Sequence, residues 1–183
     1  MIHILVVSGS NRNGRQSIKA VDQIAEIINA QDGARAEILD LANFRLPPFD
    51  DGDQRSEEVK ADIEIIRNQF QKCDGLVIVS PEYNGGMAGS LKNTLDYFRP
   101  EYSWKPFGAV SVSSGTLGGQ NAMHQLVQFA SYVNACLMPN RLLVSKVNEI
   151  GLQTEFAEVF DKNAQKFCTD MIRFTKAIVA AKV

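Results

Sequence analysis

The feature that most constrains the fold is an apolar run in the middle of the chain that leads directly into a polar, glycine-rich loop. Residues 75–80 are continuously apolar and rich in β-branched side chains up to the final serine, which predicts a strand buried on both faces of a parallel sheet. We expect this strand to stop where Pro81 begins the loop. Leu91 and Leu95 follow at helical spacing, so the loop leads into a helix. Loops of this kind bind ligands in open α/β sheets.

Two more units of the same kind flank the central one. Residues 2–7 predict a strand that leads through a polar loop into a helix, and residues 107–113 predict another strand before a third such loop. Shorter strands are predicted at 34–41 and 136–144. Strands that alternate with helices predict a doubly wound α/β protein. We therefore expect a flavodoxin-like three-layer sandwich over residues 1–183 as a single domain, with five parallel strands in the order 2-1-3-4-5 and helices on both faces.

Composition excludes several classes of function. The formal net charge of −2 leaves no basic surplus for nucleic acid, and no apolar run approaches the ~20 residues that span a bilayer. The first residues already form a predicted strand, so we expect no signal peptide. The three cysteines are scattered, which predicts free thiols and a cytoplasmic protein. With only two histidines, we expect neither a metal site nor a Ser/His triad, and the chemistry must come from a bound cofactor.

Each of the three loops has residues suited to a ligand. The first, at residues 8–17, places hydroxyls, Arg12 and Arg15 before a helix N-terminus, which suits a phosphate, although a solvated turn with surface arginines is the alternative. It is neither a P-loop nor a dinucleotide fingerprint. The second combines an acid, an aromatic ring and an amide, which favours a flat ligand over a plain turn. The third, at residues 114–119, has glycines that allow a ligand to approach the backbone closely.

The three loops also carry the motifs of a known family. They read Ser8-Gly9-Ser10-Asn11-Arg12 with Ser17, then Pro81-Glu82-Tyr83-Asn84 with Gly89, then Ser114-Gly115 with Gly118-Gly119. In this order they resemble the signatures of the NADPH-dependent FMN reductase family, flavodoxin-like enzymes that include flavin, quinone, azo-dye and chromate reductases. The resemblance runs from Ile2 to about Pro139. Family members often carry arginines where Asn121 and Val127 stand here, so contacts of those arginines are not transferred.

The resemblance implies an FMN-dependent NAD(P)H oxidoreductase with a ping-pong mechanism. Hydride would pass from NADPH or NADH to bound FMN, and electrons would then pass to a small acceptor such as a flavin, a quinone, an azo compound or chromate. No side chain would be catalytic, because the flavin carries the chemistry. A homodimer or homotetramer is implied. The implied FMN-binding residues are Ser10, Arg12, Gln16, Ser17, Ile18, Pro81, Glu82, Tyr83, Asn84, Gly85, Ser114, Gly115 and Gly118.

Two other functions stay open. One is a flavodoxin-type FMN electron carrier without NAD(P)H activity, which the arginines of the first loop and the small net charge disfavour. The other is a binding protein that keeps the fold without the flavin, which the motifs in all three loops disfavour. For a reductase, we expect backbone N–H groups around residues 115–119, at a helix N-terminus, to stabilise negative charge on the ring. We also expect Asn134 to end a helix in the left-handed conformation, Pro139 to lie on an edge strand, and Trp104 to pack beneath a loop.

Overall fold

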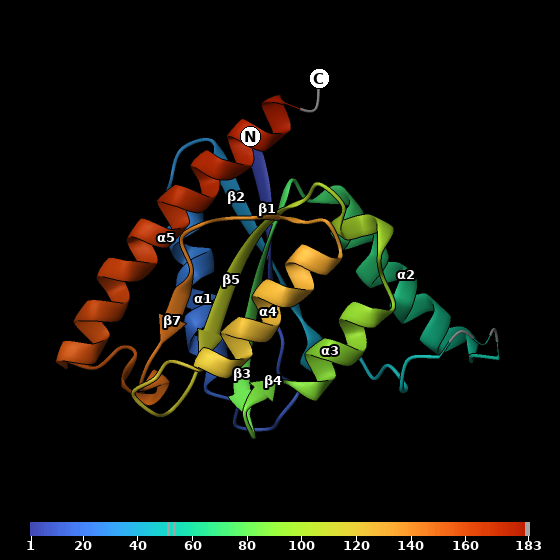
Figure 1. The fold of residues 1–183 in the computed structure, drawn as a ribbon, viewed down its shortest axis with the longest axis horizontal. Coiled ribbons are helices and arrows are strands. Elements are labelled where there is room, and N and C mark those ends of the chain that lie inside the picture. The colour runs from blue at the N-terminus through green and yellow to red at the C-terminus, as the bar shows by residue number, and fades with distance from the viewer. Residues whose placement is uncertain (51, 53, 182–183) are drawn as a thin grey trace.

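A twisted parallel sheet crosses the molecule, with helices on both of its faces (Figure 1). The computed structural model describes residues 1–50, 52 and 54–181. The main strands follow the order β2-β1-β3-β5-β6, while β4 pairs with β3 and β7 pairs with β5. Apart from the extra short strands, this is the predicted order 2-1-3-4-5, so the flavodoxin-like fold is confirmed. The strands are β1 (Ile2–Ser8), β2 (Ala34–Asp40), β3 (Gly75–Tyr83), β4 (Gly86–Met87), β5 (Pro106–Val112), β6 (Cys136–Leu137) and β7 (Leu142–Val144).

Two hydrophobic clusters attach the helices to opposite faces of the sheet. Successive side chains of β1 alternate between them: Ile4 and Val6 join the cluster that contains α1 and α5, whereas Leu5 and Val7 join the cluster that contains α2, α3 and α4. This alternation is why β1 reads as a continuous apolar run. The helices are α1 (Ser17–Asn29), α2 (Glu57–Lys72), α3 (Gly89–Asp96), α4 (Gln120–Tyr132) and α5 (Glu155–Ala180), with short 3-10 turns η1 (Leu41–Asn43), η2 (Pro100–Tyr102) and η3 (Val147–Glu149).

The central strand is longer than predicted. It continues through Pro81, which pairs with Val112 of β5, and then forms an antiparallel hairpin with β4. The turn of this hairpin is Asn84-Gly85, where φ is 51° and 78°, as the tight turns between antiparallel strands require. The prediction that the strand stops before Pro81 was therefore wrong. Pro81 removes one N–H donor at the end of the ladder, and the hairpin pairing beyond it keeps the backbone extended.

Three local predictions have mixed outcomes near the other end of the sheet. The strand predicted at 136–144 is split into β6 and β7, and Pro139 lies between the two segments beside β5. Asn134 has φ of 57°, so its left-handed conformation at the end of α4 is confirmed. Trp104 was predicted wrongly, because its side chain is 66% exposed and does not pack beneath a loop. Its backbone N–H instead donates to the Asn134 carbonyl at 2.9 Å, which fixes the main chain and leaves the ring in solvent.

Candidate functional site

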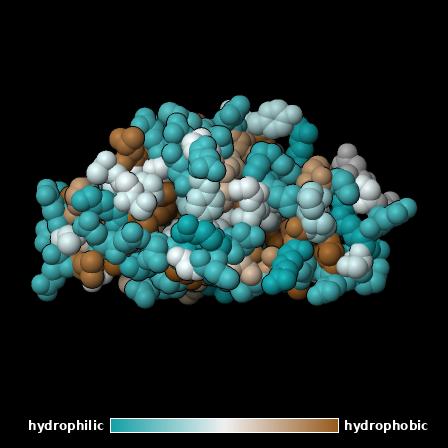
Figure 2. Space-filling model, turned by 90° about the horizontal axis from the view of Figure 1, so that it is seen from below, coloured by the Kyte–Doolittle hydropathy of each residue, from teal (hydrophilic) through white to brown (hydrophobic). Residues whose placement is uncertain are grey.

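A cavity of about 570 Å³ opens where the parallel strands end. Its size lies within the range of small-molecule sites. The face of the molecule at this edge is largely hydrophilic, with hydrophobic residues scattered over it (Figure 2). The segments before α1, along the end of β3 and after β5 meet here, as the sheet topology predicts. The lining consists of Arg12, Gln16, Ser17, Pro81, Glu82, Tyr83, Val112, Ser113, Ser114, Val147 and Asn148.

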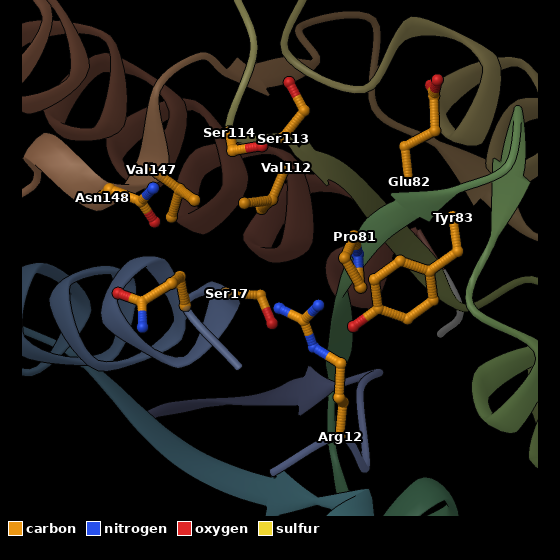
Figure 3. A pocket seen from close by; sticks show the side chains of 11 residues that line it. Arg12, Ser17, Pro81, Glu82, Tyr83, Val112, Ser113, Ser114, Val147 and Asn148 are labelled. Atoms are coloured by element: carbon orange, nitrogen blue, oxygen red, sulfur yellow. The ribbon is translucent and has the colours of Figure 1, made fainter. Parts of the chain in front are cut away.

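One end of the cavity presents hydrogen-bond donors at the start of α1. Ser17, the first residue of this helix, is 4% exposed, and its hydroxyl has no hydrogen-bond partner among the described residues. The preceding residue, Gln16, makes no side-chain cap to the helix. The guanidinium of Arg12 extends toward Ser17 (Figure 3). A buried hydroxyl without a partner, uncapped N–H groups and a cation together fit a phosphate group.

The two arginines of the first loop have different roles. Arg15 forms an ion pair with Asp40 at the end of β2, where both side chains are less than one-fifth exposed. Asp40 also accepts the Ala42 N–H at 3.1 Å, which holds its carboxylate in place. The ion pair between Arg15 and Asp40 therefore anchors the first loop to the sheet. Arg12 makes no such pair with any residue that the structure describes, and its guanidinium carbon lies 5.5 Å from the centre of the Tyr83 ring. Arg12 is therefore the arginine of this loop that faces the cavity.

The other end of the cavity has a flat, partly apolar wall. Pro81 and Tyr83 come from the end of β3, and Val112 comes from the end of β5. The Tyr83 hydroxyl is 2.7 Å from the hydroxyl of Ser10, which is fully buried and ties the first loop to β3. Gly9 is required beside it, because a Cβ there would lie 2.7 Å from the Val79 carbonyl oxygen. This wall is suited to a planar ring whose phosphate lies at the opposite end.

Glu82 caps the helix that follows the third loop. Its carboxylate accepts the backbone N–H groups of Asn121 at 2.8 Å and Ala122 at 3.2 Å, and the Asn121 side-chain amide at 3.2 Å. Burial opposes ionisation of this carboxyl, but these hydrogen bonds outweigh burial and lower its pKa. The N–H groups of residues 121 and 122, at the start of α4, are thus already occupied. Donors for a ligand from this unit must come from the loop before α4.

The structure divides the predicted site residues into two groups. Those that line the cavity are Arg12, Gln16, Ser17, Pro81, Glu82, Tyr83 and Ser114. Those outside its lining are Ser10, Ile18, Asn84, Gly85, Gly115 and Gly118. Among the latter, Asn84 and Gly85 form the hairpin turn, and Gly118 packs on β7, where a Cβ would lie 2.8 Å from that of Leu143. Contact of all these residues with a cofactor stays a prediction.

Sequence reasoning missed four residues of the lining. Val112 and Ser113 directly precede Ser114, the first residue of the third motif. Extending that motif by two positions toward the N-terminus would have included them. Val147 and Asn148 belong to η3, which follows β7 and brings a fourth loop (residues 145–149) to the cavity. No motif marks that segment. Only the placement of β7 beside β5 reveals it.

A second cavity, of about 1120 Å³, lies between α3 and α4. It is lined by aromatic rings such as Tyr97, Phe129 and Tyr132, by aliphatic side chains, and by charged and amide side chains. The phosphate donors at the start of α1 do not line it. The smaller cavity is therefore the candidate site. Of the two cavities, which are formed by described residues, it is the one lined both by those donors and by the ends of the parallel strands.

A doubly wound sheet with free hydrogen-bond donors at a helix start and a flat wall at its carboxyl edge is the arrangement of flavodoxin-like nucleotide-cofactor proteins. The sequence profile of the family described as NADPH-dependent FMN reductase matches residues 2–149. An NADPH azoreductase from Bacillus sp. (strain OY1-2) is 26% identical over 178 residues, which cover 97% of this chain and 92% of that protein. A quinone reductase from Escherichia coli (strain K12) is 28% identical over 131 residues, covering 69% and 70%.

The fold comparison agrees with the sequence comparison. FerB, a flavoenzyme NAD(P)H:(acceptor) oxidoreductase from Paracoccus denitrificans, superimposes with a TM-score of 0.80 over 97% of this chain and 98% of that one, at 18% identity. The chain belongs to the NADPH-dependent FMN reductase family. It is an oxidoreductase of the flavoprotein class, with FMN as cofactor and NAD(P)H as electron donor.

Proposed function

We propose that the chain binds FMN in the smaller cavity and passes electrons from NAD(P)H to a small acceptor by a ping-pong mechanism. The acceptor would be a flavin, a quinone, an azo compound or chromate. The observation that carries the proposal is the polarity of the cavity: the buried Ser17 hydroxyl provides a phosphate donor at one end, Pro81 and Tyr83 provide a flat wall at the other, and the Arg12 guanidinium lies between them (Figure 3). FMN has the same polarity, with a charged phosphate and a planar ring.

The residues of the chain would bind and orient the cofactor. Arg12 and the buried Ser17 hydroxyl would hold the phosphate, with Gln16 beside them. The wall formed by Pro81 and Tyr83 would fix the plane of the ring. When bound, FMN supplies the redox chemistry by accepting a hydride and then releasing electrons to the acceptor. Ser114 lies on the third loop, opposite the first loop across the cavity (Figure 3), where its hydroxyl would limit how the ring is placed.

The visible absorption spectrum of the purified protein tests the proposal. FMN is added, unbound FMN is removed, and NADPH is then added under anaerobic conditions. Flavin bands that remain with the protein and bleach on NADPH would support a reductase. Bands that persist with both NADPH and NADH would favour the electron carrier instead. Protein that retains no flavin would refute the proposed site.

Steady-state kinetics address the acceptor and the order of steps. The azoreductase and quinone reductase among the relatives make an azo dye and a benzoquinone the first acceptors to compare by kcat/KM, with free FMN and chromate after them. A ping-pong mechanism gives parallel lines when reciprocal rates are plotted at several acceptor concentrations. Lines that intersect would show that donor and acceptor bind together and would refute it.

Assembly and location are also proposals. We infer a homodimer or homotetramer from the family resemblance, and sedimentation velocity measures it directly, with a monomer as the contrary result. Within the described part of the chain, no helix combines the length and apolarity needed to cross a membrane. The cytoplasmic location rests on the scattered, unpaired cysteines, of which Cys73 and Cys168 are buried. Cell fractionation tests it.

A further inference from the structure

The fourth loop is fastened to the third loop by a set of hydrogen bonds. Ser113 exchanges two backbone bonds with this segment, donating to the Val144 carbonyl at 3.0 Å and accepting the Val147 N–H at 3.1 Å. The Lys146 N–H donates to the Gly115 carbonyl at 2.9 Å. The Ser145 hydroxyl donates to the Thr116 carbonyl at 2.7 Å. The segment after β7 is therefore held rigidly against the part of the cavity that faces Ser17.

The same loop is also tied to the start of α1. Lys19, in the first turn of that helix, donates from its ammonium group to the Asn148 carbonyl at 3.2 Å. Lys146 has φ of 44°, an uncommon conformation for a side-chain-bearing residue, and its ammonium group lies 4.0 Å from the centre of the Phe156 ring. Backbone strain of this kind persists where the surroundings enforce it, commonly at binding sites. These contacts leave the exposed side chain of Asn148 at the rim of the cavity, across from Ser17 (Figure 3).

We propose that Asn148 is a fourth-loop ligand of the FMN phosphate, donating from its side-chain amide from the side opposite Arg12. This inference rests on the proposed function of the cavity. A phosphate held by Ser17 and Arg12 has three oxygens to satisfy, and Asn148 provides a neutral donor on its remaining side. The ammonium group of Lys19 adds positive charge at the same end, and the carboxylate of the neighbouring Glu149 is paired with the Lys146 ammonium group at 3.4 Å. Glu82 places its carboxylate at the start of α4. The distribution of charge thus favours the phosphate beside Asn148.

The test compares FMN with riboflavin, which has the same ring and ribityl chain but no phosphate. Dissociation constants are measured by flavin-fluorescence titration for the wild type, Asn148→Ala and Asn148→Asp. Loss of a donor should raise the Kd of FMN several-fold in the alanine variant. A carboxylate facing the phosphate should raise it further, by about tenfold or more, in the aspartate variant. The Kd of riboflavin should change less than about twofold in both variants, because no phosphate is present.

Asn163→Asp is the matched control, because Asn163 is exposed on α5 outside the candidate cavity and the substitution adds the same charge. It should bind both flavins as the wild type does. If Asn148→Asp changes the Kd of FMN and of riboflavin equally, or changes neither, the assignment of Asn148 is overturned. The proposed function of the cavity still stands in that case, provided that the wild type binds FMN. Wild-type protein that binds no FMN would overturn both. Thermal unfolding of the flavin-free variants confirms that each is folded when titrated.

Discussion

Replacing Arg12 by alanine isolates the charge that the cavity offers to a phosphate. A hydrogen bond to a charged group contributes about 1.5–3 kcal/mol. In the structure the guanidinium carbon lies over the Tyr83 ring, 5.5 Å from its centre. An exposed cation–π contact of this kind contributes about 0.5–1 kcal/mol, which must be given up when Arg12 turns to the phosphate. The difference of about 1–2 kcal/mol corresponds to a rise of about 5- to 30-fold in the Kd of FMN.

Isothermal titration of flavin-free protein with FMN measures this change. Arg173→Ala is the matched control, because it removes the same charge from an exposed position on α5 and should leave the Kd unchanged. Arg12→Lys keeps the charge but loses the two-pronged guanidinium, so its Kd should lie between those of the wild type and Arg12→Ala. If Arg12→Ala and Arg173→Ala bind FMN equally well, Arg12 does not contact the phosphate and the orientation proposed for FMN is wrong.

Substitutions at three further positions test other parts of the site. Ser17→Ala should raise the Kd of FMN several-fold without lowering the Tm measured before FMN is added, because the hydroxyl has no hydrogen-bond partner among the described residues; a lower Tm would contradict this. Glu82→Ala should lower the free energy of unfolding by about 1 kcal/mol by removing the cap of α4. The fold lowers the pKa of Glu82 from its ordinary value of 4.5, so the ionised carboxylate stabilises the protein above pH 4.5. The difference in free energy of unfolding between wild type and Glu82→Gln should therefore shrink as the pH falls below 4.5. Chemical denaturation at several pH values measures this difference, and a difference that is independent of pH would contradict the prediction. Gly118→Ala should destabilise by about 2 kcal/mol, since φ is 63° and the new Cβ meets Leu143, and an unchanged Tm would show that the loop relaxes.

The sequence predicted those parts of the fold that local periodicity determines. The apolar stripe of α1 and the continuous apolar run of β1 need no partner to be recognised, because burial on one face or on both leaves its own pattern. The β3–β4 hairpin was missed, because Pro81 is a local stop signal and the pairing that overrides it is made farther along the chain. Likewise, the split of residues 136–144 depends on how each half meets β5.

The candidate site was likewise predicted from the sequence only in part. The motifs around Arg12, Tyr83 and Ser114 were visible in the sequence and line one cavity. The family resemblance pointed to Arg12, but the role of Arg15 was not visible, because its partner is Asp40, 25 residues away. Asn148 carries no motif, and its position follows only from the order of strands in the sheet.

The two hydrophobic clusters have a mechanical consequence for the holoprotein. The first loop leads into α1 on one face of the sheet, whereas β3 and β5 lead to α3 and α4 on the other. The Ser90 hydroxyl of α3 already donates to the Gly9 carbonyl of the first loop at 3.0 Å, and a single FMN molecule spanning the cavity would add a second link between the two layers. Free FMN at 1,000 times its Kd would add about 4 kcal/mol to the free energy of unfolding. Loss of FMN from the holoprotein should therefore lower its Tm.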